Sequence, residues 1–205
     1  MARSVLAVTT MEKAASTRER LMDAAVVLFY EHGFHAIGLD RILADVGVTK
    51  TTFYNHFESR DALIVAVLEH RDQRDMDQLR EELARRGGGP RERILELFEI
   101  LDEWFRDESF RGCLFINAAA QFPNPNDPVH VISARHGRNL AGLFAELARE
   151  AGAAEPELLA RQLSMLAAAA ITARQVNGDE GAASTARDMA AALLESSLAS
   201  RRAPG

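Results

Sequence analysis

The sequence has a single cysteine among its 205 residues, so no disulfide can form within the chain. This residue, Cys113, lies in an apolar segment, which favours a buried and inert thiol over a redox sensor. No second cysteine is present to resolve an oxidised one. These features suit a reducing compartment, and we expect a cytoplasmic protein.

Long apolar runs are also missing. The apolar stretch from residue 5 to residue 8 is too short for the core of a signal peptide. No run approaches the roughly 18 apolar residues that cross a membrane. We therefore expect neither a leader sequence nor a membrane partner.

The sequence lacks the usual signs of catalysis and metal binding. Its six histidines include no HExxH motif and no pair spaced four residues apart. Ser133, His136 and Asp127 would lie on one helix and its cap, without a nucleophile-elbow motif. We predict no metal, no cofactor and no enzyme.

The residues that are abundant favour helices. Hydrophobic residues make up 47% of the chain, several windows are rich in alanine, and only six prolines interrupt it. We predict an all-α fold of about nine helices. The net charge is −6, yet the first 60 residues carry seven basic and seven acidic side chains, against 17 and 23 in the remainder. The acidic excess therefore lies outside the N-terminal part, which leaves that part open to an anionic partner.

The most specific pattern lies between residues 33 and 63. Apolar residues recur as one face of a short helix requires, at Leu39, Ile42, Leu43 and Val46. Gly47 stands where that helix would end in a left-handed residue, and Thr49 can cap a second helix that runs to about Phe57. Two helices joined by a three-residue turn with glycine predict a helix-turn-helix.

The second of these helices has a polar outer face. Phe53 and Phe57 form its apolar stripe, which leaves an exposed side without acids, made of Lys50, Thr51, Tyr54 and Asn55. Such side chains donate to phosphate oxygens, reach base edges or touch a thymine methyl group. We predict that this face contacts double-stranded DNA; the alternative is a hairpin whose polar face is only solvated.

The run GFHAIGLDRILADVGVTKTTFYNHFESRDAL resembles the DNA-binding domain of the TetR family of bacterial transcription regulators, over about residues 16 to 66. That family shows a Gly-aromatic pair, then a helix and turn like I-A-x-x-A-G-V-S, then Y-x-H-F and a basic residue. The resemblance assigns DNA contacts to Thr49, Lys50, Thr51, Tyr54, His56 and Arg60. Ile37 and Gly38 stand where the family usually has threonine, so one phosphate contact is expected to be missing.

The resemblance also implies a function. It implies a ligand-responsive homodimer, a repressor that leaves a palindromic operator when a small-molecule inducer binds. The competing hypothesis is a helical ligand-binding or scaffold protein, or a small enzyme, whose helix-turn-helix is only structural.

We predict four regions along the chain. Residues 1–15 form a mobile tail, residues 16–60 a three-helix DNA-binding domain, and residues 61–86 a connecting helix with a solvated, charged middle. Three glycines at 87–89, followed by Pro90, separate this helix from a helical ligand-binding and dimerisation domain at 87–205.

Two further sites are predicted in that last region. Polar groups lie among aromatic ones, which suggests a ligand pocket, although each residue also suits plain core packing: Trp104, Phe105, Phe115, Asn117, Gln121, Phe122, His136 and Arg174. The last two helices have broad apolar faces that a second copy could cover as a four-helix bundle, and the resemblance places the dimer contact there too: Leu163, Leu166, Ala170, Met189, Leu193 and Ser197.

Overall fold

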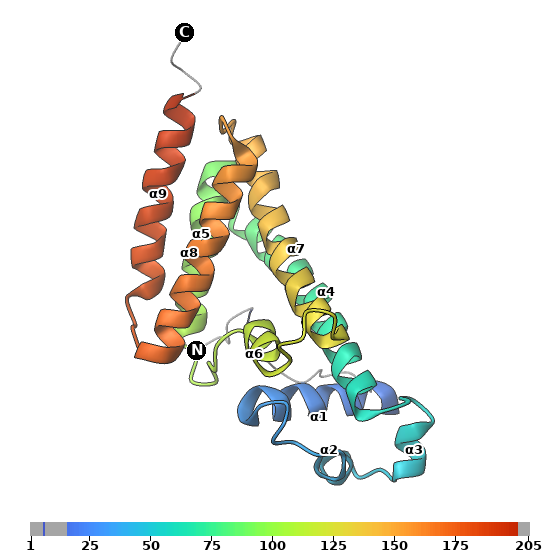
Figure 1. Cartoon of the computed structure of the whole chain (residues 1–205). Coiled ribbons are helices and arrows are strands. Elements are labelled where there is room, and N and C mark those ends of the chain that lie inside the picture. Colours follow the sequence, from blue (N-terminus) through green and yellow to red (C-terminus); the bar gives the residue numbers. More distant parts are fainter. Residues whose placement is uncertain (1–5, 7–15, 201–205) are drawn as a thin grey trace. The chain divides into compact units, whose positions relative to one another are not determined.

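The computed structural model describes residue 6 and residues 16–200, so the predicted tail at 1–15 lies outside the described residues except for Leu6. The described part contains helices and no strand, which confirms the predicted all-α fold (Figure 1). Its nine helices are α1 (Thr17–His32), α2 (Leu39–Val46), α3 (Lys50–Tyr54), α4 (Arg60–Arg86), α5 (Pro90–Phe105), α6 (Leu114–Gln121), α7 (Pro128–Glu150), α8 (Pro156–Asn177) and α9 (Ala182–Ser200).

The capping residues act as their types predict. Ser16 and Glu19 form a reciprocal capping box at the start of α1. Gly47 ends α2 in the left-handed region, at φ 73° and ψ 39°, where a side chain would be strained. Thr49 caps α3 by accepting a hydrogen bond from the backbone N–H of Thr52. These local signals confirm the predicted helix-turn-helix.

Two helices are shorter than predicted. Helix α3 ends at Tyr54, before Phe57. The apolar run FRGCLFINAAAQF predicts a helix that begins near Ser109, but α6 begins at Leu114, because Ser109 is held in a turn by Asp107 and Gly112 has a φ of 84°. The apolar pattern extends beyond the C-terminal end of α3 and beyond the N-terminal end of α6.

The middle of α4 is charged but partly buried, whereas the sequence predicted that it is solvated. Arg71, Asp72 and Asp75 are buried, because they continue the helical stripe whose other members include Leu68, Met76 and Leu79. Burying ionised groups is favourable only if they are paired. Asp72 accordingly lies 2.9 Å from Nδ1 of His136 and also pairs with Arg135.

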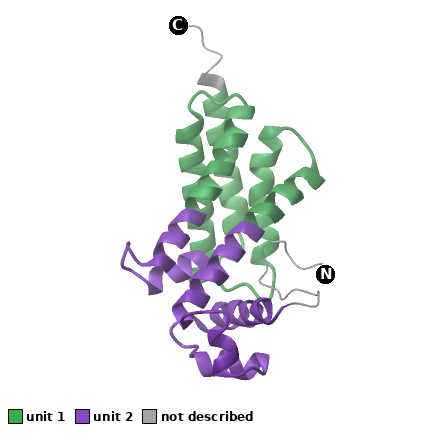
Figure 2. Ribbon diagram, turned by 90° about the vertical axis from the view of Figure 1, so that its right-hand side faces the viewer, with its two compact units in different colours: residues 1–7, 75–112, 137–205 green, residues 8–74, 113–136 purple. Residues whose placement is uncertain are grey.

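The chain forms two compact units, and each is discontinuous in sequence (Figure 2). Unit 2 contains residues 8–74 and 113–136, and unit 1 contains residues 1–7, 75–112 and 137–205. This division differs from the predicted boundary at the 87–89 glycines. Helix α6 and the start of α7 belong with α1–α3, and α4 and α7 each run from one unit into the other.

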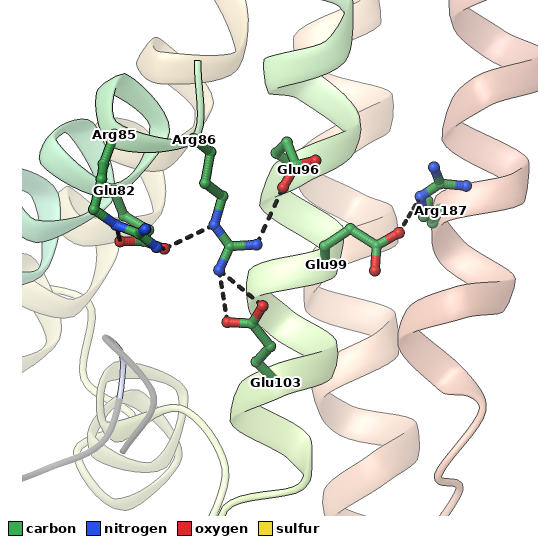
Figure 3. A network of polar contacts seen from close by, with 7 residues as sticks. All are labelled: Glu82, Arg85, Arg86, Glu96, Glu99, Glu103 and Arg187. Atoms are coloured by element: carbon green, nitrogen blue, oxygen red, sulfur yellow. Dashed lines mark hydrogen bonds and ion pairs between the residues drawn. The ribbon is translucent and has the colours of Figure 1, made fainter. Parts of the chain in front are cut away.

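Within unit 1, an arginine holds the end of α4 against α5 (Figure 3). The guanidinium of Arg86 donates to three carboxylates, at 2.7 Å to Glu82, 3.1 Å to Glu96 and 2.6 Å to Glu103. On α5, Glu99 also pairs with Arg187 of α9. Because Glu96 and Glu103 are on α5 and Glu82 is on α4, Arg86 fixes the corner that the following glycines form.

The ion pairs at this corner lower the pKa of Glu82 to about 2, through the hydrogen bond from Arg85 and then that from Arg86. Stability from such a lowered pKa is complete above the ordinary value of 4.5 and is lost as the pH falls towards 2. We expect Glu82→Gln to reduce the free energy of unfolding by about 1–3 kcal/mol at pH 7, and this difference from the wild type should shrink by pH 3. Urea unfolding at both pH values measures it, with the exposed neighbour Glu81→Gln as control; an equal difference at both would contradict the assignment.

Candidate nucleic-acid interface

The helix-turn-helix is positioned by its apolar side. Phe53 of α3, Ile42 of α2 and Leu21 of α1 are fully buried, and Phe53 lies 5.6 Å from the ring of Phe57. Arg20 of α1 donates to the carbonyl of Val46 at 2.6 Å, so the last turn of α2 is held from α1. The outer side of α3 is thereby fixed in orientation.

That outer side is the polar face the sequence predicted. The residue Tyr54 is 56% exposed, whereas its neighbour Phe53 is fully buried. The other predicted contacts on and after α3 are exposed as well: Lys50, Thr51, Asn55 and His56. Thr49 is exposed too, although its hydroxyl already serves as the cap of α3. These residues share one accessible surface; their contacts with DNA stay a prediction.

The exposed side of α3 carries no acid of its own, as predicted, but one acid of α2 lies beside it. Asp40, in the first turn of α2, places Oδ1 2.8 Å from Nζ of Lys50. This hydrogen bond raises the pKa of Lys50, so the ammonium keeps its charge. The sequence pattern missed the pair because it considered the two helices one at a time.

Arg60 has a structural role that the sequence did not reveal. Its guanidinium donates to the carbonyl of Ile37 at 2.8 Å and to the carbonyl of Phe34, and it lies over the ring of Phe29. The side chain is 23% exposed. Arg60 therefore holds the loop between α1 and α2, and its predicted contact with DNA is untested. Gly38 caps α2 without a side-chain hydrogen bond, as its lack of a hydroxyl requires.

The same loop is also held by Gln121, at the end of α6. Its side-chain oxygen accepts hydrogen bonds from the backbone N–H groups of Phe34, at 2.9 Å, and His35, at 3.2 Å. Nε2 of His35 lies 2.8 Å from the carbonyl of Gln121. A Cβ on Gly33, whose φ is 86°, would come within 3.3 Å of the same Gln121 oxygen. Glycine thus allows α6 to approach this loop.

The predicted pocket residues do not form one cluster within either unit. Unit 2 contains Phe115, Asn117, Gln121, Phe122 and His136. In it, the rings of Phe115 and His136 are stacked with centroids 3.8 Å apart. The carboxamide of Gln121 is bonded to the backbone of the α1–α2 loop, and its place in a ligand pocket stays a prediction.

The remaining three lie in unit 1, where Trp104 and Phe105 are buried. Both pack against Phe110, and Arg174 lies over that ring. Nε1 of Trp104 is buried without a hydrogen-bond partner in the described part of the chain. A nearby open cleft of about 450 Å³ includes only Arg174 of the predicted set.

The predicted dimer residues also differ in exposure. Leu163 and Ala170 are buried in the core of the protomer, so the prediction that they face a partner is wrong. Leu166, Leu193 and Ser197 are half-buried, and Met189 is 51% exposed. The sequence showed which helices have two apolar sides, but not which side packs inside the protomer.

The described residues offer neither a membrane span nor a metal site. No helix there is long and apolar enough to cross a membrane. No group of three or more histidine, cysteine, aspartate or glutamate side chains there is arranged to hold a metal ion. Cys113 is buried, as its apolar surroundings predicted.

Comparisons with known proteins agree with this geometry. Residues 21–67 match the family model described as "Bacterial regulatory proteins, tetR family". The chain is 28% identical to the HTH-type transcriptional repressor NemR of Escherichia coli over 131 residues, 63% of this chain and 66% of NemR. It is 35% identical to the HTH-type transcriptional regulator UidR of Escherichia coli over 69 residues, 34% of this chain and 35% of UidR. The matches thus span just under two thirds of NemR and about a third of UidR.

Solved structures extend the similarity beyond the helix-turn-helix. A TetR-family transcriptional regulator from Streptomyces coelicolor is similar with a TM-score of 0.81 and 29% identity, over 88% of this chain and 95% of that one. The reduced form of Escherichia coli NemR is similar with a TM-score of 0.78 and 25% identity, over 85% and 94%. From the helix-turn-helix, the family match and these structures together, we conclude that the chain belongs to the TetR family of bacterial transcription regulators.

Proposed function

We propose that the protein is a dimeric, ligand-responsive repressor that binds a palindromic operator in the cytoplasm and leaves it when a small-molecule inducer binds. The observation that carries the proposal is the exposed polar side of α3. Tyr54 and Asn55 present a phenol and an amide to solvent while Phe53 fixes the helix from behind. Side chains of these kinds can reach base edges from a helix in the major groove.

The experiment that tests the function is selection of DNA by the purified protein from duplexes with a randomised core, followed by gel shift of the selected duplex. We expect two symmetric half-sites whose centres are about one helical turn, roughly 34–36 Å, apart. Binding should weaken as salt rises, because phosphate contacts release counterions. Absence of any preferred sequence would instead support the competing hypothesis of a structural hairpin.

The second part of the proposal is that the protein forms a dimer. It is supported by exposed apolar side chains. The described residues include seven large hydrophobic side chains that are exposed, and four of them lie on α8 and α9: Leu158, Met165, Val176 and Met189. An apolar groove of about 480 Å³ beside Met165, between α7 and α8, adds a surface that a partner can fill. An apolar groove with an exposed hydrophobic side chain such as Met165 at its edge is typical of an interaction site.

We expect Met165→Glu to give a monomer with unchanged helical circular dichroism and at least tenfold weaker operator binding, because one half-site supplies fewer contacts. Met165 is 66% exposed, so the substitution leaves the protomer core intact. Ser184→Glu is the matched control: it adds the same charge in the first turn of α9, where an acid is favourable. Analytical ultracentrifugation decides, and a variant that remains dimeric would place the interface elsewhere.

The third part is the response to a ligand, supported by the contacts of α6. This helix carries three of the predicted pocket residues, Phe115, Asn117 and Gln121, and the last of them bonds to the loop before α2. A ligand that binds better when α6 is displaced would therefore loosen that loop, by its difference in affinity for the two states.

Gln121→Leu should imitate the loosened state. We expect faster amide hydrogen exchange at Phe34 and His35, together with weaker operator binding, because both N–H groups lose their acceptor. Gln121→Glu keeps an acceptor and is the control. Wild-type operator affinity in the leucine variant, despite faster exchange, would exclude this route for the ligand response.

A further inference from the structure

The ion pair between Asp40 and Lys50 is formed by the first turn of α2 and the first residue of α3. Oδ1 of Asp40 lies 2.8 Å from Nζ of Lys50. The side chain of Asp40 is 78% exposed and that of Lys50 is 62% exposed. The N-terminal residues of a recognition helix are those that contact base edges. The pair therefore belongs to the surface proposed to meet DNA, and the inference that follows rests on that proposed function.

The charges of this pair do not suit a phosphate contact. A phosphate oxygen bound by Lys50 would lie close to the carboxylate of Asp40, which has the same sign of charge. The attraction between a protein and the DNA backbone depends on net positive charge. Because the pair of Asp40 and Lys50 has no net charge, it adds little to that attraction. A different role must therefore account for a lysine placed at the start of α3.

The hydrogen-bonding groups of the pair match one kind of base pair. An ammonium has three N–H donors, so Lys50 retains two when one is bonded to Asp40, and the carboxylate retains acceptor capacity beside them. In the major groove, guanine presents two neighbouring acceptors, N7 and O6, and its cytosine presents the N4 donor next to O6. Adenine with thymine presents acceptor, donor and acceptor, so the second N–H of the lysine would face a donor.

We propose that Asp40 and Lys50 together read one G·C base pair of the operator. Lys50 donates to N7 and O6 of guanine, and Asp40 accepts from N4 of the paired cytosine. Asp40 also keeps Lys50 directed away from phosphate. The ion pair already present in the protein holds donor and acceptor side by side before DNA arrives.

The test uses the full-length protein and the duplex that it selects from a randomised pool. Each G·C pair of a half-site is replaced singly by A·T, and affinity is measured by gel shift. At one position the wild type should lose roughly tenfold, as expected for one well-formed base contact. Lys50→Ala should bind both duplexes equally, and Asp40→Asn, which keeps the lysine donors but loses the carboxylate, should lose part of the preference. Lys50→Ala should leave the slope of affinity against salt unchanged, because no phosphate contact is removed.

Asp45→Asn is the matched control, because it removes the same charge from another exposed position of α2. It should raise affinity for all duplexes slightly and keep the base preference. If Asp40→Asn behaves like this control, Asp40 only repels phosphates and the inference is wrong, while the proposed function stands. If the wild type selects no sequence, the proposed function fails and the inference fails with it.

Discussion

The backbone groups of the loop between α1 and α2 are the constraint on which the orientation of the recognition helix depends. Helices leave their terminal N–H and C=O groups without partners, and a buried group left so costs about 1–3 kcal/mol. Here Gln121 accepts from two N–H groups of the loop, and Arg60 donates to two of its carbonyls. The start of α2 is therefore set by side chains outside that helix. Helix α3 follows from there, because Arg20 holds the last turn of α2 and Phe53 packs behind α3.

Local chemistry was readable from the sequence. Ser16, Gly47 and Thr49 cap their helices as their residue types require, and the spacing of Ile42, Leu43 and Val46 gave the buried side of α2. These features depend on neighbours within a few residues. The exposed face of α3 followed from them, because once Phe53 is buried the positions of the other side chains around a helix are determined.

Contacts between distant segments were not readable in this way. The bond between Gln121 and Phe34 joins residues 87 positions apart, and no periodicity within α6 indicates it. Burial of Asp72 contradicted its polarity, because the period of α4 and not the character of the residue decides which positions face the core. The same holds for Asp40 and Lys50, which share a surface only after the turn brings two helix starts together. Pairing of charges across elements is a property of the fold.

The order of the segments has a consequence for how such regulators diversify. Unit 2 is assembled from residues 8–74 and 113–136, so the helix-turn-helix and the helix α6 that bonds to its first loop are encoded by separate segments of the gene. A single crossover between two related genes, placed anywhere between these segments, would join one parent's α1–α2 loop to the other parent's α6. The hydrogen bonds between that loop and α6 are then kept only when both segments are exchanged together, or when the two parents share the residues at Gly33 and Gln121.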